Sequence, residues 1–110
     1  MELSLRHIKF IPADIPIFFC GDLNINYSSD DGKAILKPMF EYMNSAAVSA
    51  QNHDSSTATT YNKWGNSTKT LDYIFYRNAT ALSYKVVNSA DYGTKYISDH
   101  YPIYSDMVVK

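Results

Sequence analysis

The sequence predicts an α/β (α+β) fold in a single domain. Hydrophobic residues make up 45% of the 110 residues, enough for one modest core. Two segments carry apolar residues at three- and four-residue spacing, which is typical of helices, and four short apolar runs have the length of strands. No internal repeat or linker interrupts them, so we expect one domain over residues 1–110.

Two amphipathic segments are predicted to be helices. The first covers residues 2–11, and the second covers residues 33–44 with Asp30 or Asp31 as its cap. Pro38 falls inside the second pattern. Because proline disrupts a helix interior, it should lie near the first turn of a late-starting helix or produce a kink.

Four apolar segments are predicted to be strands. They cover residues 15–20, 71–76, 83–87 and 103–109. The first is apolar throughout, as in a strand buried on both faces, and Cys20 at its end is expected to be an inert core residue. Residues 44–70 are polar and are expected to form a loop with one short edge strand over 57–61; residues 88–99 are expected to be loop.

The composition excludes several classes of protein. A formal net charge of -1 gives no global basic field, so a nucleic-acid role would need a local patch. A single cysteine cannot form an intramolecular disulfide. No apolar run approaches the roughly 20 residues that cross a bilayer, so we expect no membrane span.

The run Gly21-Asp22-Leu23-Asn24 follows the first predicted strand. If the chain stays extended, Asp22 and Asn24 point to the same face. A carboxylate and an amide that converge there can hold a water molecule and a phosphate oxygen. The open alternative is a Gly-Asp turn in which Asn24 bonds to the local backbone.

A second carboxylate, Asp72, lies inside the apolar run 71–75. Burying a carboxylate without a partner costs several kcal/mol, so Asp72 needs one unless it faces water at a strand edge. The run 98–102 supplies His100, whose imidazole a carboxylate would orient and favour in its charged form. Because adjacent side chains of an extended segment diverge, Asp99 should point away from His100 and could approach a metal. The alternative for His100 is a structural role, which is common for a lone histidine.

Together these three runs resemble the last three motifs of the endonuclease/exonuclease/phosphatase superfamily, to which deoxyribonuclease I belongs. The glycine-aspartate-leucine-asparagine, aspartate-tyrosine-isoleucine and serine-aspartate-histidine motifs occur in the family's order. The resemblance implies half of a deoxyribonuclease I-like four-layer α/β sandwich, with a mixed, mainly antiparallel sheet and flanking helices. It also implies a divalent-metal-dependent phosphoester hydrolase in which an activated water attacks in line.

The resemblance implies a role for each matching residue. Asp22 orients or deprotonates the water, and Asn24 donates to a phosphate oxygen or helps to hold that water. Asp72 keeps His100 oriented, and His100 contacts the scissile phosphate. Asp99 lies near the cation, which is Mg²⁺ or Mn²⁺.

A substrate rim is expected in the polar middle of the chain. Tyr61 and Trp64 could stack on a sugar or base, and Lys63 could contact a phosphate. The alternative is an exposed turn that Trp64 anchors. The substrate classes left open are phosphorylated sugars, lipid headgroups, nucleotides and nucleic acids.

The family domain is much longer than this chain, and its early motifs, including the principal glutamate metal ligand, have no match here. The chain therefore resembles the C-terminal half and is expected to be inactive or weak alone. Half a sandwich leaves an apolar sheet face that should pair with the missing N-terminal half or a second copy. Two alternatives remain: a non-catalytic interaction module, and an unrelated α/β protein in which Asp72 and His100 lie far apart.

Overall fold

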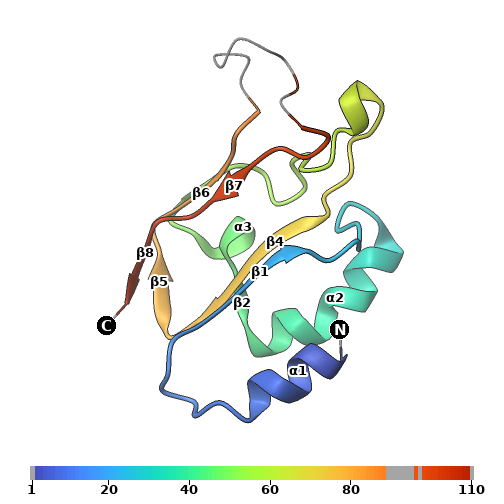
Figure 1. Cartoon of the computed structure of the whole chain (residues 1–110). Coiled ribbons are helices and arrows are strands. Elements are labelled where there is room, and N and C mark those ends of the chain that lie inside the picture. The colour runs from blue at the N-terminus through green and yellow to red at the C-terminus, as the bar shows by residue number, and fades with distance from the viewer. Residues whose placement is uncertain (1, 89–95, 97, 110) are drawn as a thin grey trace.

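A computed structural model describes residues 2–88, 96 and 98–109 of the chain (Figure 1). Strand β4 (Asp72–Arg77) lies at the centre of a three-stranded sheet. It pairs antiparallel with β1 (Ile17–Asp22) on one side and with β2 (Asn44–Ser45) on the other. The strands predicted over 15–20 and 71–76 are therefore confirmed, each shifted by one or two residues.

The remaining strands form a second three-stranded sheet and a two-stranded sheet. Their bounds are β3 (Asn52–His53), β5 (Ala79–Ala81), β6 (Ser83–Val86), β7 (Ile103–Tyr104) and β8 (Met107–Val109). β6 pairs parallel with β3 and antiparallel with β7, and β5 pairs antiparallel with β8. The pairing is therefore mixed and mainly antiparallel, as expected. The single strand predicted over 103–109 is instead two strands that belong to different sheets.

The two predicted helices are present as α1 (Glu2–Lys9) and α2 (Asp30–Tyr42), and a short α3 (Ala46–Ser49) was not foreseen. α2 begins after Ser29, whose hydroxyl accepts a hydrogen bond from the Gly32 N–H at 3.0 Å. Ser29, and not either aspartate, is therefore the cap. Pro38 lies inside α2, beyond its first turn.

Alternate residues of β4 pack into two hydrophobic clusters on opposite sides of the sheet. Tyr73 and Phe75 belong to the cluster that also holds residues of α1 and α2. Ile74 and Tyr76 belong to the other, with residues of α3, β5 and β6. Helices α1 and α2 thus cover one face of the sheet, and α3 packs on the other (Figure 1).

Strand β1 is covered on one face only, so the prediction of burial on both faces is wrong. Ile17 is buried and Phe19 packs against the helical cluster. Phe18 on the opposite face is 48% exposed, and Cys20 is exposed as well. The prediction that Cys20 is a core residue is therefore wrong. It failed because an apolar run in the sequence does not show whether a second layer of the fold covers the strand.

Two further expectations concern the loops. Over 57–61 there is no strand; the segment makes only isolated bridges at Tyr61. The expected loop over 88–99 lies mostly outside the described residues. None of the helices described is long and apolar enough to cross a membrane.

Candidate active site

Two carboxylates face each other where β1 and β4 pair at one end of the sheet. Asp22 is the register partner of Asp72 in this antiparallel pair. Like charges directly opposite each other destabilise a sheet, so the pair needs a compensating group. The side chain of Asp72 is only 16% exposed, which removes the alternative of a strand-edge aspartate facing water.

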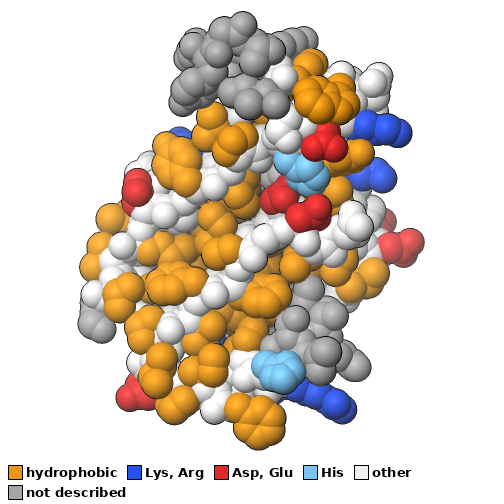
Figure 2. Space-filling model, in the orientation of Figure 1, with side chains coloured by type: hydrophobic (Ala, Val, Ile, Leu, Met, Phe, Trp, Pro, Cys, Tyr) orange, Lys and Arg blue, Asp and Glu red, His pale blue; other side chains and the backbone are white. Residues whose placement is uncertain are grey.

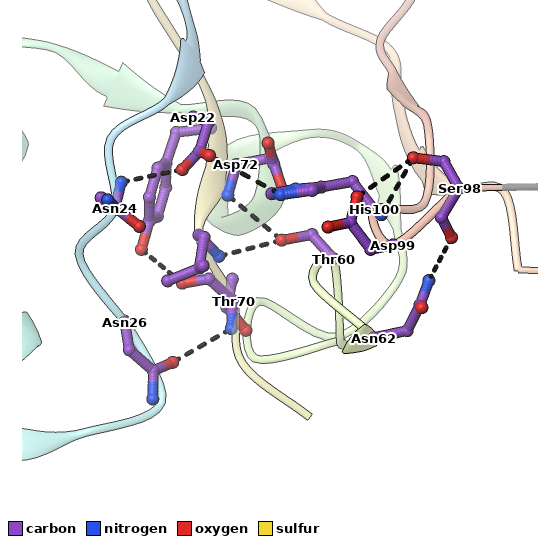
Figure 3. Close-up of polar contacts among 12 residues, drawn as sticks. Asp22, Asn24, Asn26, Thr60, Asn62, Thr70, Asp72, Ser98, Asp99 and His100 are labelled. Atoms are coloured by element: carbon purple, nitrogen blue, oxygen red, sulfur yellow. Dashed lines mark hydrogen bonds and ion pairs between the residues drawn. The ribbon is translucent and has the colours of Figure 1, made fainter. Parts of the chain in front are cut away.

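His100 supplies that group, because each of its two ring nitrogens faces one of the two carboxylates (Figure 3). Nδ1 is 2.8 Å from Oδ2 of Asp72, and Nε2 is 3.7 Å from Oδ2 of Asp22. The hydrogen bond with Asp72 raises the pKa of His100, and the charges of Asp72, Asp22 and Asp99 raise it further against an opposing effect of burial. The expected contact of Asp72 with His100 is present, so the alternative in which they lie far apart is wrong.

The backbone after β1 turns at Asn24, so the extended chain on which the pairing of Asp22 with Asn24 was predicted is not present. Asn24 has a left-handed φ of 58°, a conformation that asparagine tolerates better than most residues. Its N–H donates to Oδ1 of Asp22 at 2.8 Å, which fixes that carboxylate (Figure 3). This turn differs from the alternative left open, because the side chain that bonds to the local backbone is Asp22 and not Asn24, and the bond orients Asp22.

Asp99 is not one of the three converging side chains. Its carboxylate accepts a hydrogen bond from the Ser98 hydroxyl at 3.3 Å. Its carbonyl accepts hydrogen bonds from the N–H groups of Asn62 and Lys63, at 2.8 and 3.2 Å. The residue thus joins the histidine segment to the loop that begins at Asn62.

The three residues expected at a substrate rim lie beside this histidine segment. The Tyr61 ring is 4.9 Å from the His100 ring, centroid to centroid. Lys63 and Trp64 lie in the short η1 turn (Lys63–Gly65) with positive φ values of 46° and 55°, and Trp64 is 57% exposed. Two successive non-glycine residues in this region store strain, which concentrates at functional sites. Trp64 is too exposed to anchor the turn by burial.

Two buried polar residues behind the site, Thr60 and Asn62, were not predicted from the sequence. They are 0% and 2% exposed. Each contacts the backbone of a segment that carries a site residue. In a run rich in threonine and asparagine, nothing distinguishes them from ordinary loop residues.

The chemistry of this donor set fits part of a divalent-cation site. Asp22, Asp72 and His100 each offer one ligand atom, and these atoms lie within 4.8 Å of one another. Carboxylate oxygens are preferred by hard divalent cations. Because Asp72 and His100 already bond to each other, the described residues supply only a part of an octahedral shell.

Solved structures show the same fold. An endonuclease/exonuclease/phosphatase from Bacteroides vulgatus is 23% identical, with a TM-score of 0.76 over 99% of this chain. A mannosyl-6-phosphatase from Bacteroides thetaiotaomicron is 19% identical with a TM-score of 0.69 over 97%, and a conserved protein of unknown function from Enterococcus faecalis is 17% identical with a TM-score of 0.71. The chain spans 42–43% of the length of these proteins.

No curated protein sequence matches the chain. A family model does, and it matches residues 2–100, which include all three motifs. The neighbouring structures agree with it, so the fold is a part of the deoxyribonuclease I-like sandwich. The chain belongs to the Endonuclease/Exonuclease/phosphatase family.

Proposed function

We propose that this chain carries part of the active site of a divalent-metal-dependent phosphoester hydrolase that works by in-line attack of an activated water. The observation that supports this best is that the two ring nitrogens of His100 face Asp72 and Asp22. Nδ1 is hydrogen-bonded to the Asp72 carboxylate, which orients the ring. Nε2 faces the Asp22 carboxylate at 3.7 Å without a hydrogen bond.

In this proposal the two carboxylates have different tasks. Asp72 orients the imidazole, and Nε2 of His100 donates to an oxygen of the scissile phosphate. The 3.7 Å between Nε2 and Asp22 is too long for a hydrogen bond, so both atoms are available to substrate and water. Asp22, fixed through its other oxygen, orients or deprotonates the attacking water, and the Asn24 amide contacts the phosphate or that water.

We assign Asp99 to the cation, Mg²⁺ or Mn²⁺, because it offers a carboxylate next to His100. When bound, the cation polarises the phosphoryl group and neutralises its charge. Since the chain spans 42% of the Bacteroides vulgatus protein, we expect further ligands to come from outside these residues and turnover by the chain alone to be weak or absent.

The proposed substrates are phosphorylated sugars, lipid headgroups, nucleotides and nucleic acids. Tyr61, Lys63 and Trp64 would contact the part of the substrate beyond the phosphate. The structural similarity to a mannosyl-6-phosphatase supports the inclusion of sugar phosphates. The net charge of -1 gives no support to long nucleic acids, whose binding normally needs a basic surface.

The test measures phosphoester hydrolysis in the presence of Mg²⁺ or Mn²⁺. It is done with the chain alone, and again after adding the part of the Bacteroides vulgatus protein that the chain does not cover. We expect His100→Ala and Asp22→Ala each to lower turnover by about 10²–10⁴-fold. His53→Ala is the matched control, because His53 is exposed and bonds to the Asp54 carbonyl. Turnover near wild type in His100→Ala would refute the assigned roles.

The face of β1 that carries the exposed Phe18 and Cys20, here called its open face, supports a second candidate function. This is a self-associating or interaction module that retains the fold. Figure 2 shows hydrophobic side chains over much of the face in view, with acidic side chains and a histidine gathered in its upper part. The exposed large hydrophobic residues of the described strands include Phe18 of β1, Tyr104 of β7 and Val108 of β8. A partner layer would bury such surface, and we propose a second copy, or the part of the family domain that this chain does not cover, as that layer.

Light scattering separates this candidate from a monomeric chain. We expect a mass that rises with concentration and that falls toward the monomer in Phe18→Glu. Ile35→Glu is the control, because Ile35 is 52% exposed on α2 and lies away from β1's open face. A concentration-independent monomer in the wild type would exclude self-association.

A further inference from the structure

A short segment, residues 60–62, lies between the two halves of the site. Its Tyr61 makes isolated antiparallel bridges to Lys69 on one side and to His100 on the other. The Thr60 N–H donates to the Lys69 carbonyl at 3.0 Å, and the Tyr101 N–H donates to the Thr60 carbonyl at 2.7 Å. We call residues 60–62 the strap.

The first end of the strap holds the start of β4. Thr60 is completely buried, and its Oγ1 accepts hydrogen bonds from the N–H groups of Leu71 and Asp72, at 2.9 and 3.1 Å (Figure 3). A buried hydroxyl bonded to two successive N–H groups fixes the backbone there, because losing the bonds would leave buried donors unsatisfied. The Thr60 hydroxyl therefore fixes the backbone position from which the Asp72 side chain extends.

The other end holds the histidine segment. Asn62 is 2% exposed, and its amide Nδ2 donates to the Ser98 carbonyl at 3.1 Å. Its Oδ1 accepts from the Trp64 N–H at 2.7 Å, and its own N–H donates to the Asp99 carbonyl at 2.8 Å. One buried side chain thus ties together the residues before His100 and the strained η1 turn.

We propose that Thr60 and Asn62 are positioning residues and that the strap sets the separation of Asp72 and His100. These two residues come from segments 28 positions apart in sequence. The strap bonds to the backbone at or beside each of them, and its Tyr61 ring packs beside the imidazole. Because the Asp72–His100 hydrogen bond depends on a 2.8 Å contact, a small shift of either backbone weakens it.

The test uses the proton on Nδ1 of His100, observed by low-temperature NMR of the chain as a downfield resonance of a histidine bonded to a carboxylate. Thr60→Val removes the hydroxyl at nearly constant volume, and we expect the resonance to disappear or move upfield. Thr60→Ser keeps the hydroxyl and should restore it. Thr70→Val is the matched control, because Thr70 is 2% exposed and its hydroxyl bonds to the Ala58 carbonyl away from the pair.

The proposal is wrong if folded Thr60→Val keeps the wild-type resonance, or if Thr70→Val loses it to the same extent. If Thr60→Val does not fold, Asn62→Asp decides in the same way, because it removes the donor to Ser98 and keeps the acceptor for Trp64.

The effect on turnover rests on the proposed function. Thr60→Val should lower kcat about 10- to 100-fold with KM little changed, since Thr60 does not touch the substrate. The NMR readout needs no activity, so the two ideas can fail separately. Loss of the resonance together with unaffected turnover in His100→Ala would support the strap and refute the proposed function.

Discussion

The two faces of β1 differ sharply within six residues. Ile17 and Phe19 point toward α1 and α2 and pack into a cluster with Phe75 of β4. Phe18 and Cys20 point the other way and stay exposed. Asp22 belongs to this second row, so the open face ends at the candidate active site.

We therefore expect one face of β1 to contribute mainly to stability and the other to position the candidate active site. The face of β1 that α1 and α2 cover packs into a hydrophobic cluster that contains no site residue. The open face places Asp22, Asp72 and His100 at its end, with Asp22 exposed. Substitutions on the two faces should therefore have very different consequences.

The largest expected effect is on the closed face. Phe75→Ala should lower the free energy of unfolding by about 3–5 kcal/mol, because Phe75 is completely buried. Phe18→Ala, on the open face, should change it by less than about 1 kcal/mol. Chemical denaturation measures both values. Equal losses would show that another layer covers the open face.

A smaller effect is expected at Gly21, where β1 approaches the site. Its φ of 144° favours glycine, and a Cβ added there would meet no atom within 4 Å. Gly21→Ala should therefore cost about 1–3 kcal/mol from backbone strain alone. An unchanged free energy of unfolding would mean that the backbone relaxes, and the Asp22–Asn24 contact should then be re-examined by NMR.

The smallest effect is the pH dependence of the site's contribution to stability. The folded-state pKa of His100 is raised by its hydrogen bond with Asp72. The contribution is fully present below the unfolded value of about 6.5, and it is lost as the pH rises through the higher folded value. The stability difference between wild type and His100→Asn should therefore shrink above about pH 6.5. A difference that is constant with pH would contradict the assigned ion pair.

Much of this fold follows from local pattern. β4 has an apolar run long enough to identify a strand, and α2 has helical periodicity over three turns. The short strands β2 and β3 have two residues each, which is too few for any pattern, and they exist only because longer strands lie beside them.

Some features of the candidate site could likewise be predicted from the sequence, and others could not. The contact between Asp72 and His100 could be expected, because a carboxylate within an apolar strand needs a partner. The turn at Asn24 and the buried strap residues Thr60 and Asn62 could not, since both depend on backbone contacts between distant segments. The exposure of Cys20 was missed for a similar reason: burial depends on which layers pack around a strand.

We propose that His100 contacts the phosphate. The most direct test of this contact is a titration with inorganic phosphate in the presence of Mg²⁺, followed through the imidazole resonances of the chain's three histidines. We expect a saturable shift of the His100 resonances that is weakened in Asp72→Asn, while the resonances of the exposed His7 and His53 do not move. Equal shifts of all three histidines, or a His100 resonance that phosphate leaves unchanged, would contradict it.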